Sequence, residues 1–444
     1  MKHLPLSHRA LDDIILLHNS QGVSCSRFVG LCQSLARQMP EQPMVINLCE
    51  DRLAFSVSFC ATLLAGGANL LPANRLPASV EQIVSKWPQA IIITDQNHSG
   101  RHNSAIAIQD LLTQHPQSDE MPSISADQLA AVVYTSGSSG AASEITKSWR
   151  VLYHSSLINM AEYGPGQLTH ALATVPPQHM WGLETTVLAP LFGPLIMSPE
   201  QPLFATDIIA ALNQMASPRA LISTPVHLRA LLMSGIALPP IDRIYSATAP
   251  LPANMAQRLE QSTGAHVMDI YGCSEVGCLA KRAPAHDEDW QLFNAFSLQQ
   301  KNCSHTVSAA HLPAPVELMD LLQAHETDTR RFQLVGRQND LINIAGKRAS
   351  MSGLTQILLD TPGVLDAVIF QRPSDDEVKT ARLAALVVAP ELTVVQLREH
   401  LSSRIDAVFM PRPLRLVEQL PRTSSGKLPE QDLLHFYTSN CNGA

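Results

Sequence analysis

The sequence predicts an α/β fold, with a large amino-terminal domain followed by a smaller second domain. Its 444 residues exceed what one hydrophobic core usually supports, so at least two cores are expected. In the first 125 residues, short apolar runs at Val45–Leu48 and Ala90–Thr94 alternate with a helical segment at Ala54–Leu64. Such alternation is typical of mostly parallel sheets that are covered by helices.

The character of the chain changes towards its carboxyl terminus. Residues 282–329 are polar and are expected to be irregular, with Trp290 and Phe293 as hydrophobic anchors. The pattern beyond them predicts a small α+β domain. Its expected elements are strands at 367–370 and 381–388 and an amphipathic helix at 393–405.

Composition excludes several classes of protein. Hydrophobic residues make up 45% and charged residues 16%, as in ordinary globular enzymes. A net charge of −8 without any block of Lys or Arg argues against nucleic-acid binding. The start, MKHLPLSHRALDD, lacks the apolar core of a signal peptide, and no apolar run is long enough to span a membrane, so a cytoplasmic protein is expected. The eight cysteines include no CxxC pair, which argues against a disulfide framework and against a zinc site.

A buried strand and a glycine-rich turn form the central motif. The run Leu129–Tyr134 is almost continuously apolar and then breaks into Thr135, Ser136, Gly137, Ser138, Ser139 and Gly140. Two glycines can adopt positive φ, so successive N–H groups can form a nest for a polyphosphate. The alternative is a Ser/Gly-rich linker, but linkers rarely begin at the end of a buried strand.

A second motif, Asp269–Glu275, combines side chains that suit a nucleotide. The Tyr271 ring can stack on adenine, the Ser274 hydroxyl can bind a phosphate, and Glu275 can hold Mg²⁺ through its oxygens. The alternative is a strand that ends in a turn with an incidental acid. The phosphate-binding interpretation of the upstream loop favours the nucleotide.

Three further segments contain candidate motifs. TVPPQHMWG at Thr174–Gly182 ends a strand with two prolines, and residues 244–251 include a run of small residues that lets other groups approach the backbone closely. LPRTSSGK at 420–427 ends in Lys427, which is followed by leucine and therefore does not belong to a Walker A loop.

In this order, these segments resemble the motifs of the adenylate-forming superfamily, which comprises acyl- and aryl-CoA synthetases, acyl-ACP synthetases and peptide-synthetase adenylation domains. The corresponding family patterns are YTSGSTGxPK, YGxTE and LPRTxxGK, and Phe332–Lys347 resembles the hinge pattern GRxDDxIKxxG. The resemblance covers most of the chain and is greatest for short acyl- and aryl-ACP ligases. It implies an ATP- and acid-binding domain at 1–337 and a mobile lid domain at 338–444.

The resemblance also implies roles for individual residues. Lys427, Thr135 and Glu275 would be catalytic, with Thr135 and Glu275 also holding Mg²⁺. The implied ATP-binding residues are Ser136, Gly137, Ser138, Ser139, Gly140, Ala247, Thr248, Ala249, Tyr271, Gly272, Ser274, Asp320 and Arg337. The implied acid pocket consists of His179, Trp181, Gly182 and Cys273. The implied hinge and thiolation residues are Asn339, Asp340 and Gly346.

Some positions depart from the family patterns. The usual loop lysine is missing near Ala142 and Ser143; Lys147 either reaches back to the phosphates or is a solvated surface lysine. The ribose-binding aspartate is Asp320 or Asp328, and Met319 stands where glycine is expected before Asp320. These departures keep a second hypothesis open, a degenerate adenylating fold that only binds a nucleotide or an acid.

The resemblance implies a two-step reaction. A small carboxylic acid, aryl or medium-chain acyl, attacks ATP to give an acyl-adenylate, and a phosphopantetheine thiol then displaces AMP. An acyl carrier protein is the expected acceptor, with Lys347 and Arg348 as candidate docking cations, and CoA is the alternative. The cofactors implied are ATP and Mg²⁺.

Overall fold

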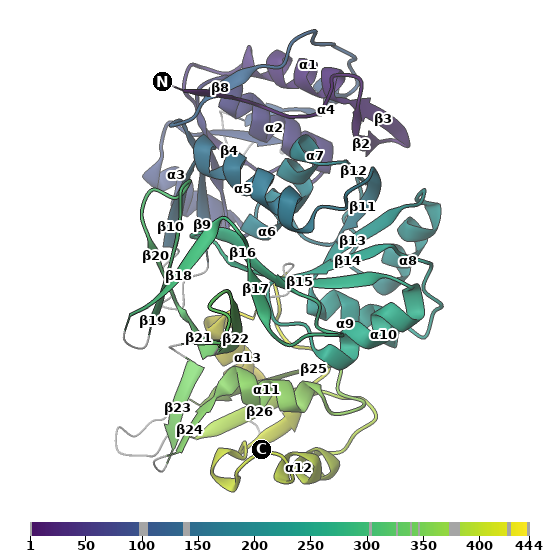
Figure 1. Cartoon of the computed structure of the whole chain (residues 1–444), viewed down its shortest axis with the longest axis vertical. Helices are drawn as coiled ribbons and strands as arrows, with labels where there is room; N and C mark the ends of the chain where they lie inside the picture. The colour runs from purple at the N-terminus through teal and green to yellow at the C-terminus, as the bar shows by residue number, and fades with distance from the viewer. Residues whose placement is uncertain are drawn as a thin grey trace.

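The computed structural model describes residues 2–96, 105–135, 143–301, 304–325, 327–337, 340–344, 347–372, 382–423 and 428–441. Within these ranges the chain forms two large sheets and a separate carboxyl-terminal group of elements (Figure 1). In Figure 1 the purple and blue amino-terminal elements lie at the upper end, and the green-to-yellow elements after residue 340 lie at the lower end. The expected α/β fold class is confirmed.

The first sheet is mostly parallel, as the alternation of apolar runs predicts. Its strand order is β10 (Ser143–Ser148), β9 (Leu129–Thr135), β5 (Ala68–Leu71), β4 (Met44–Asn47), β6 (Ile91–Thr94) and β7 (Ala105–Ala107). Among the strands of this sheet in the described ranges, only β10 runs antiparallel to its neighbour, with Ser143 opposite Thr135 and Lys147 opposite Ala131.

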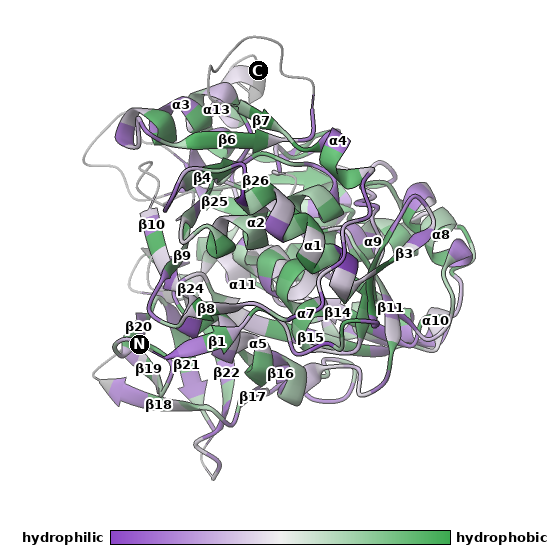
Figure 2. Cartoon of the chain, turned by 90° about the horizontal axis from the view of Figure 1, so that it is seen from above, coloured by the Kyte–Doolittle hydropathy of each residue, from purple (hydrophilic) through white to green (hydrophobic). Residues whose placement is uncertain are grey.

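The helices that accompany this sheet in the described ranges are α1 (Cys25–Ala36), α2 (Arg52–Leu64), α3 (Pro77–Lys86) and α4 (Gln109–Leu112). Helices α1, α2 and α4 contribute buried residues to the main core, and α3 packs in a second, smaller cluster. Helix α2 begins where the Asp51 carboxylate accepts a hydrogen bond from the Ala54 N–H, which satisfies one free donor of the first turn. Its residues from Arg52 to Leu63 are all buried, and Figure 2 accordingly shows a mostly hydrophobic helix in the interior.

The second sheet has a parallel centre with antiparallel edges. Its order in the described residues is β21 (Asp320–Ala324), β22 (Arg331–Arg337), β17 (Trp290–Leu292), β16 (Gly277–Arg282), β15 (His266–Cys273), β14 (Arg243–Ser246), β13 (Arg219–Ser223), β11 (Thr169–Ala173), β12 (Leu195–Met197), β2 (Ile14–His18) and β3 (Gln21–Ser24). The strands from β15 to β2 in this order are parallel. Such sheets bind ligands beyond the carboxyl ends of their strands.

The helices that accompany this sheet follow its strands along the chain. They are α5 (Trp149–Tyr163), α6 (Met180–Gly182), η1 (Leu183–Leu188), α7 (Ala189–Phe192), α8 (Ala205–Gln214), α9 (Pro225–Met233) and α10 (Ala253–Thr263). The α6–η1–α7 run follows without interruption from Met180 and ends at Phe192, before Gly193. None of the helices in the described ranges is long and apolar enough to cross a membrane.

The expectation of an irregular segment at 282–329 is wrong. This segment contains β17 and β21 of the large sheet and a small antiparallel sheet of β18 (Phe296–Lys301), β19 (Ser304–Ala309) and β20 (Val316–Leu318). In β19 the second and fourth residues, His305 and Val307, are buried between less buried neighbours. This period of two is easily hidden in a polar sequence, because one face of an antiparallel sheet can remain solvated. Trp290 and Phe293 are buried, as expected.

The carboxyl-terminal elements have hydrophobic cores of their own. They are β23 (Leu341–Ile344), β24 (Lys347–Ser350), α11 (Met351–Leu359), β25 (Asp366–Gln371), β26 (Leu383–Val388), α12 (Val394–Ser402), η3 (Ala407–Phe409), β27 (Leu414–Leu416) and α13 (Glu430–Cys441). All residues of the two clusters here come from Ile342 onwards. The predicted strands and helix are present, and α12 begins with a capping box of Thr393 and Gln396. The remaining strands, β1 (His3–Pro5) and β8 (Ser123–Ser125), pair near the amino terminus.

Candidate active site

The predicted motifs follow the carboxyl ends of parallel strands. Strand β9 ends at Thr135, β11 precedes Thr174, β14 precedes Ala247 and β15 precedes Ser274. The Thr174 and Ser223 hydroxyls are 2.9 Å apart and join the ends of β11 and β13. Strand β9 belongs to the first sheet and β11, β13, β14 and β15 belong to the second, and the carboxyl ends of parallel strands are where the topology of open α/β sheets directs a ligand.

Several predicted residues lie outside the described part of the chain. They are Ser136, Gly137, Ser138, Ser139, Gly140, Asn339, Gly346 and Lys427. Their roles therefore stay predictions. Arg337 is described only as the last residue of β22, where it stands opposite Asp320 of β21.

Residues Asp269–Glu275 form one side of a tight β15–β16 hairpin. A Cβ atom on Gly272 would lie 2.3 Å from the carbonyl oxygen of Gly277, so only glycine permits the two strands to approach this closely. The Val276 N–H donates to the Cys273 carbonyl at 3.2 Å and closes the turn. Ser274 is half-buried and Glu275 is exposed in this turn. The hairpin thus presents a hydroxyl and a carboxylate at its tip.

The donor set at these strand ends fits Mg²⁺. Among the described residues no three His, Cys, Asp or Glu side chains cluster as a metal site. Mg²⁺ in nucleotide enzymes usually takes only one or two carboxylates, with phosphates and waters as its other ligands. The exposed Glu275 carboxylate and the Thr135 hydroxyl at the end of β9 match that demand in chemistry.

Lys147 is buried and contacts this hairpin. It is 2% exposed, and its ammonium donates a 2.5 Å hydrogen bond to the carbonyl oxygen of Glu275. Burial lowers the pKa of Lys147, and the Glu184 carboxylate is the foremost charge that raises it. The alternative that Lys147 is a solvated surface lysine is therefore wrong.

Glu184 is a buried acid that the sequence analysis missed. It lies in η1 and is 2% exposed; its carboxylate accepts bonds from the Cys278 N–H and thiol, both at 3.2 Å, and from Asn159 at 3.4 Å. Burial raises the pKa of Glu184, and the bonds from Cys278 and the charge of Lys147 oppose this shift. A lone acid in the apolar run LETTVLAPLF was the signal available in the sequence.

Three of the predicted acid-pocket residues, His179, Trp181 and Gly182, directly precede Glu184 in sequence. The fourth, Cys273, lies in the β15–β16 hairpin. His179 is half-buried, whereas Trp181 is 8% exposed. A Cβ atom on Gly182 would lie 1.9 Å from the Pro176 carbonyl oxygen, so this glycine allows the preceding loop to pack on the helix. Burial raises the pKa of Cys273 to about 12, which leaves a neutral thiol beside the hairpin tip.

The small-residue segment after β14 has a strained backbone. Ala247 is buried, whereas Thr248 and Ala249 are exposed. Thr248 adopts a φ of 81°, which is uncommon for a β-branched residue. Strain of this kind is frequent at ligand sites, and the predicted role under adenine stays a prediction.

Tyr271 and Asp320 are in direct contact. The Tyr271 hydroxyl donates to Asp320 Oδ2 at 2.8 Å, and the ring, 7% exposed, packs against Trp290 and Phe332 with centroids 5.6 and 6.0 Å away. Asp328, the competing ribose candidate, instead accepts from the Arg330 N–H in a turn. The geometry thus joins Asp320 to another predicted ATP-binding residue, and it places Asp328 in a local turn.

Asp340 is bonded to the start of α11. Its carboxylate accepts hydrogen bonds from the Ser350 and Ser352 hydroxyls at 2.5 Å and from the Ser352 N–H at 3.0 Å. Lys347 forms an exposed ion pair with Asp406. One of the two candidate docking cations is therefore already partnered.

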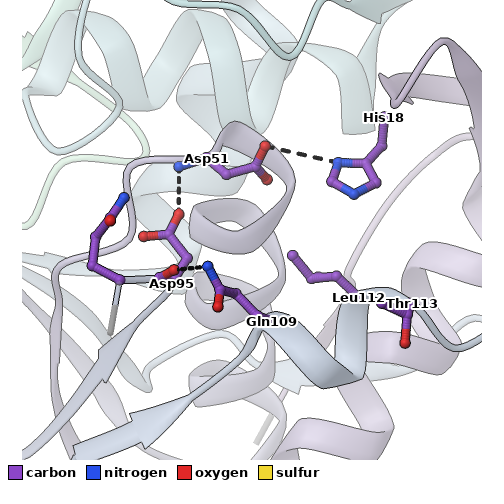
Figure 3. A pocket seen from close by; sticks show the side chains of 7 residues that line it. His18, Asp51, Asp95, Gln109, Leu112 and Thr113 are labelled. Atoms are coloured by element: carbon purple, nitrogen blue, oxygen red, sulfur yellow. Dashed lines mark hydrogen bonds and ion pairs between the residues drawn. The ribbon is translucent and has the colours of Figure 1, made fainter. Parts of the chain in front are cut away.

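A hollow lined by His18 of β2 and by residues that follow strands of the first sheet contains none of the predicted site residues (Figure 3). The Asp95 carboxylate there accepts from the Glu50 and Asp51 N–H groups, and the Gln109 side chain bonds to the Asp95 carbonyl. His18 lies 3.7 Å from the Asp51 carboxylate. The Asp51 carboxylate also caps α2, so Asp51 and Asp95 both stabilise the local fold through hydrogen bonds to backbone N–H groups.

Similar proteins identify the family. The profile described as AMP-binding enzyme matches residues 15–299, and that of the AMP-binding enzyme C-terminal domain matches 355–427. A 4-coumarate–CoA ligase of Rhodobacter capsulatus is 28% identical over 310 residues, which cover 68% of this chain and 75% of the relative. A 3,4-dihydroxybenzoate–[aryl-carrier protein] ligase of Bacillus anthracis is 22% identical over 322 residues, covering 68% and 73%.

Solved structures share the fold. O-succinylbenzoate coenzyme A synthetase (MenE) of Bacillus subtilis, in complex with AMP, matches with a TM-score of 0.81 at 16% identity, covering 97% of this chain and 98% of that one. ATP-bound MatB of Rhodopseudomonas palustris matches with a TM-score of 0.80 at 18% identity, covering 97% of each chain. The first profile alone spans more than half of the chain, and the second follows it in order. The chain therefore belongs to the AMP-binding enzymes, the adenylate-forming superfamily that its motifs resemble.

Proposed function

We propose that this chain is an AMP-forming ligase that activates a small carboxylic acid with ATP and passes the acyl group to a phosphopantetheine thiol. The observation that carries the proposal is the hydrogen bond from Tyr271 to Asp320. Asp320 in turn stands opposite Arg337 in the paired strands β21 and β22. Three residues with expected roles towards adenosine are thereby gathered from distant parts of the sequence. The names of similar proteins, which are acid–thiol ligases, support the same reaction class.

The chemistry needs positioning more than a base. A carboxylate oxygen of the acid attacks the α-phosphorus of ATP, the new O–P bond forms, and pyrophosphate leaves with the electrons of the broken bond. The thiol then attacks the acyl carbon, AMP leaves, and one proton is released. A carboxylate is already a nucleophile, so catalysis comes from orientation and cancellation of charge.

In this proposal, different residues bind the nucleotide, stabilise charge on the phosphate and hold the metal ion. Asp320 and Arg337 would hold the ribose, and the small residues at 247–249 would lie under adenine. Lys427, from the proposed lid at 338–444, would stabilise charge on the α-phosphate in the first step, when the lid closes on residues 1–337. Thr135 and Glu275 would hold Mg²⁺, which supplies positive charge to the phosphates when bound.

The acid and its acceptor are the finer parts of the proposal. We favour an aryl or medium-chain acid, which His179, Trp181, Gly182 and Cys273 would enclose. We favour a carrier protein as acceptor. The similar proteins include one named for CoA and one for an aryl carrier protein, so both acceptors occur among relatives. Lys347 would exchange its exposed partner Asp406 for an acid of the carrier, which costs little because exposed ion pairs are weak.

A second candidate, a nucleotide- or acid-binding module without catalysis, is favoured by one observation. The amine of Lys147 is bound to the Glu275 carbonyl, so the missing loop lysine has no evident replacement in the described residues. ATP–pyrophosphate exchange with a panel of aryl and medium-chain acids separates the two candidates. Acid-dependent exchange supports the ligase; binding of ATP and acid without exchange for any member supports the module.

A further inference from the structure

The bond from Lys147 to Glu275 connects the two large sheets at the candidate site. Lys147 belongs to β10 at the edge of the first sheet, and Glu275 lies in the hairpin turn after β15 of the second. The residues are 128 positions apart in sequence. A side chain of one sheet thus fixes the backbone of the other, at the turn that carries the predicted Mg²⁺ ligand.

The hairpin is held a second time by Glu184. This carboxylate accepts from the Cys278 N–H at 3.2 Å, three residues after Glu275. Gly277 between them has a φ of 94°, and a Cβ atom there would lie 2.5 Å from Glu184 Oε1. Buried Lys147 and buried Glu184 therefore bond to the backbone on the two sides of one turn. Gly277, which has no side chain, allows the Glu184 carboxylate to approach.

Burying these two charges is costly unless their hydrogen bonds and opposite charges compensate for lost hydration. A lysine that served only to fill space would be replaced more favourably by a neutral side chain of similar length. The tip residue Glu275 is exposed, so packing around its own side chain does little to fix the turn. The turn is instead restrained by the hydrogen bond that the Glu275 carbonyl oxygen accepts from the buried Lys147.

We propose that Lys147 is a positioning residue that holds the Ser274–Glu275 turn in the geometry required for Mg²⁺·ATP, with Glu184 as its buried counter-charge. It then acts through the backbone of Glu275 and does not substitute for the missing phosphate-binding lysine. The inference rests on the proposed function for its ligand, Mg²⁺·ATP, while the restraint on the turn is a property of the free protein.

The test begins with Lys147→Met, which keeps the length of the side chain and removes the donor. Hydrogen exchange in the free protein should be about tenfold faster at the amides of residues 274–277, including Val276. Calorimetric titration should show that the Mg²⁺ concentration needed for half of the maximal gain in ATP affinity rises about 10- to 100-fold, as for lost second-layer partners of metal ligands. ATP–pyrophosphate exchange should need correspondingly more Mg²⁺.

Lys281→Met is the matched control. Lys281 lies on the return strand β16 of the same hairpin and bonds through its amine to the carbonyl and carboxylate of Glu162. Its removal should leave both the exchange of residues 274–277 and the Mg²⁺ requirement unchanged. Equal effects of Lys147→Met and Lys281→Met would overturn the proposal.

A neutral double variant, Lys147→Met with Glu184→Gln, separates positioning from charge balance. It also replaces Lys147→Met in every measurement if the single variant does not fold. It should retain the fast exchange and the raised Mg²⁺ requirement; recovery of wild-type values would mean that the unpaired Glu184 caused the defect, and would overturn the role of the bond. If the wild-type protein shows no exchange of pyrophosphate with any acid, the proposed function fails, whereas hydrogen exchange still decides whether Lys147 restrains the turn.

Discussion

Arg422 and Asp366 form a two-point ion pair in the carboxyl-terminal part of the chain. Arg422 Nε donates to Asp366 Oδ2 at 2.6 Å, and its Nη2 donates to Oδ1 at 2.7 Å. Both side chains are about one-fifth exposed, at 21% and 19%. Arg422 belongs to the LPRTSSGK motif, five residues before Lys427, and Asp366 begins β25. The pair therefore anchors the segment that leads to the predicted catalytic lysine.

We expect Arg422→Gln to slow adenylate formation roughly tenfold, because two charge-assisted hydrogen bonds worth about 1.5–3 kcal/mol no longer fix the approach to Lys427. Thioester formation from supplied acyl-adenylate should change little. ATP–pyrophosphate exchange and a thiol assay measure the two steps. Arg404→Gln, which removes an exposed guanidinium on the same part of the chain, serves as the control; an equal loss there would contradict the anchoring role.

Lys427→Ala should remove most adenylate formation and leave thioester formation from supplied acyl-adenylate largely intact. Loss of one group that stabilises charge in a transition state costs on the order of 100-fold or more. The same two assays apply, with Arg422→Gln giving an intermediate defect. Loss of both steps to the same extent would remove Lys427 from its assigned role.

Glu275→Gln should bind ATP normally without metal and need far more Mg²⁺ for the same rate of exchange. A neutral amide is a poorer ligand than a carboxylate for a hard cation. The measurement is the rate of ATP–pyrophosphate exchange against Mg²⁺ concentration. An unchanged Mg²⁺ dependence would place the metal on other residues.

Tyr271→Phe should weaken ATP binding about three- to tenfold, because it removes the hydrogen bond that orients Asp320 while keeping the ring between Trp290 and Phe332. Asp320→Asn should raise the KM for ATP further, and Asp328→Asn should not. A larger effect of Asp328→Asn than of Asp320→Asn would reverse the ribose assignment.

The acceptor is decided by competition between thiols. With one activated acid, holo carrier proteins should be acylated efficiently and CoA poorly, and carrier acylation should weaken as salt rises because exposed charges are screened within about 8 Å at physiological ionic strength. Lys347→Ala should reduce carrier acylation modestly. Efficient transfer to CoA, with none to any carrier in a panel, would contradict this prediction and leave the adenylation chemistry intact.

Much of the fold could be predicted from local pattern. Strands such as β4, β6 and β9 are short apolar runs bounded by turn residues, and α12 carries its own capping signal. The small sheet of β18, β19 and β20 was not predicted. In its strand β19 buried residues alternate with less buried ones, and the many polar residues of the segment hide this alternation in the sequence. Pairing between strands depends on residues far apart in sequence, which a local pattern does not contain.

Candidate site residues could be proposed from the sequence where a motif carries its own chemistry, as at Asp269–Glu275. They could not be proposed where burial decides the role of a residue. Lys147 reads as an ordinary charged residue in the sequence, and only the arrangement of the two sheets directs its amine to Glu275. Glu184 required the same information, because its partner Cys278 is 94 residues away.

The hydrogen bonds of Asp340 have a mechanical consequence. They attach this residue to the start of α11, so Asp340 would move with the carboxyl-terminal elements in the proposed lid rotation. On the other side, Arg337 is the last residue of β22, in register with Asp320. Only residues 338 and 339 lie between these two attachments. In the proposed lid rotation, this short interval would separate the part that moves with α11 from the part held in register with Asp320.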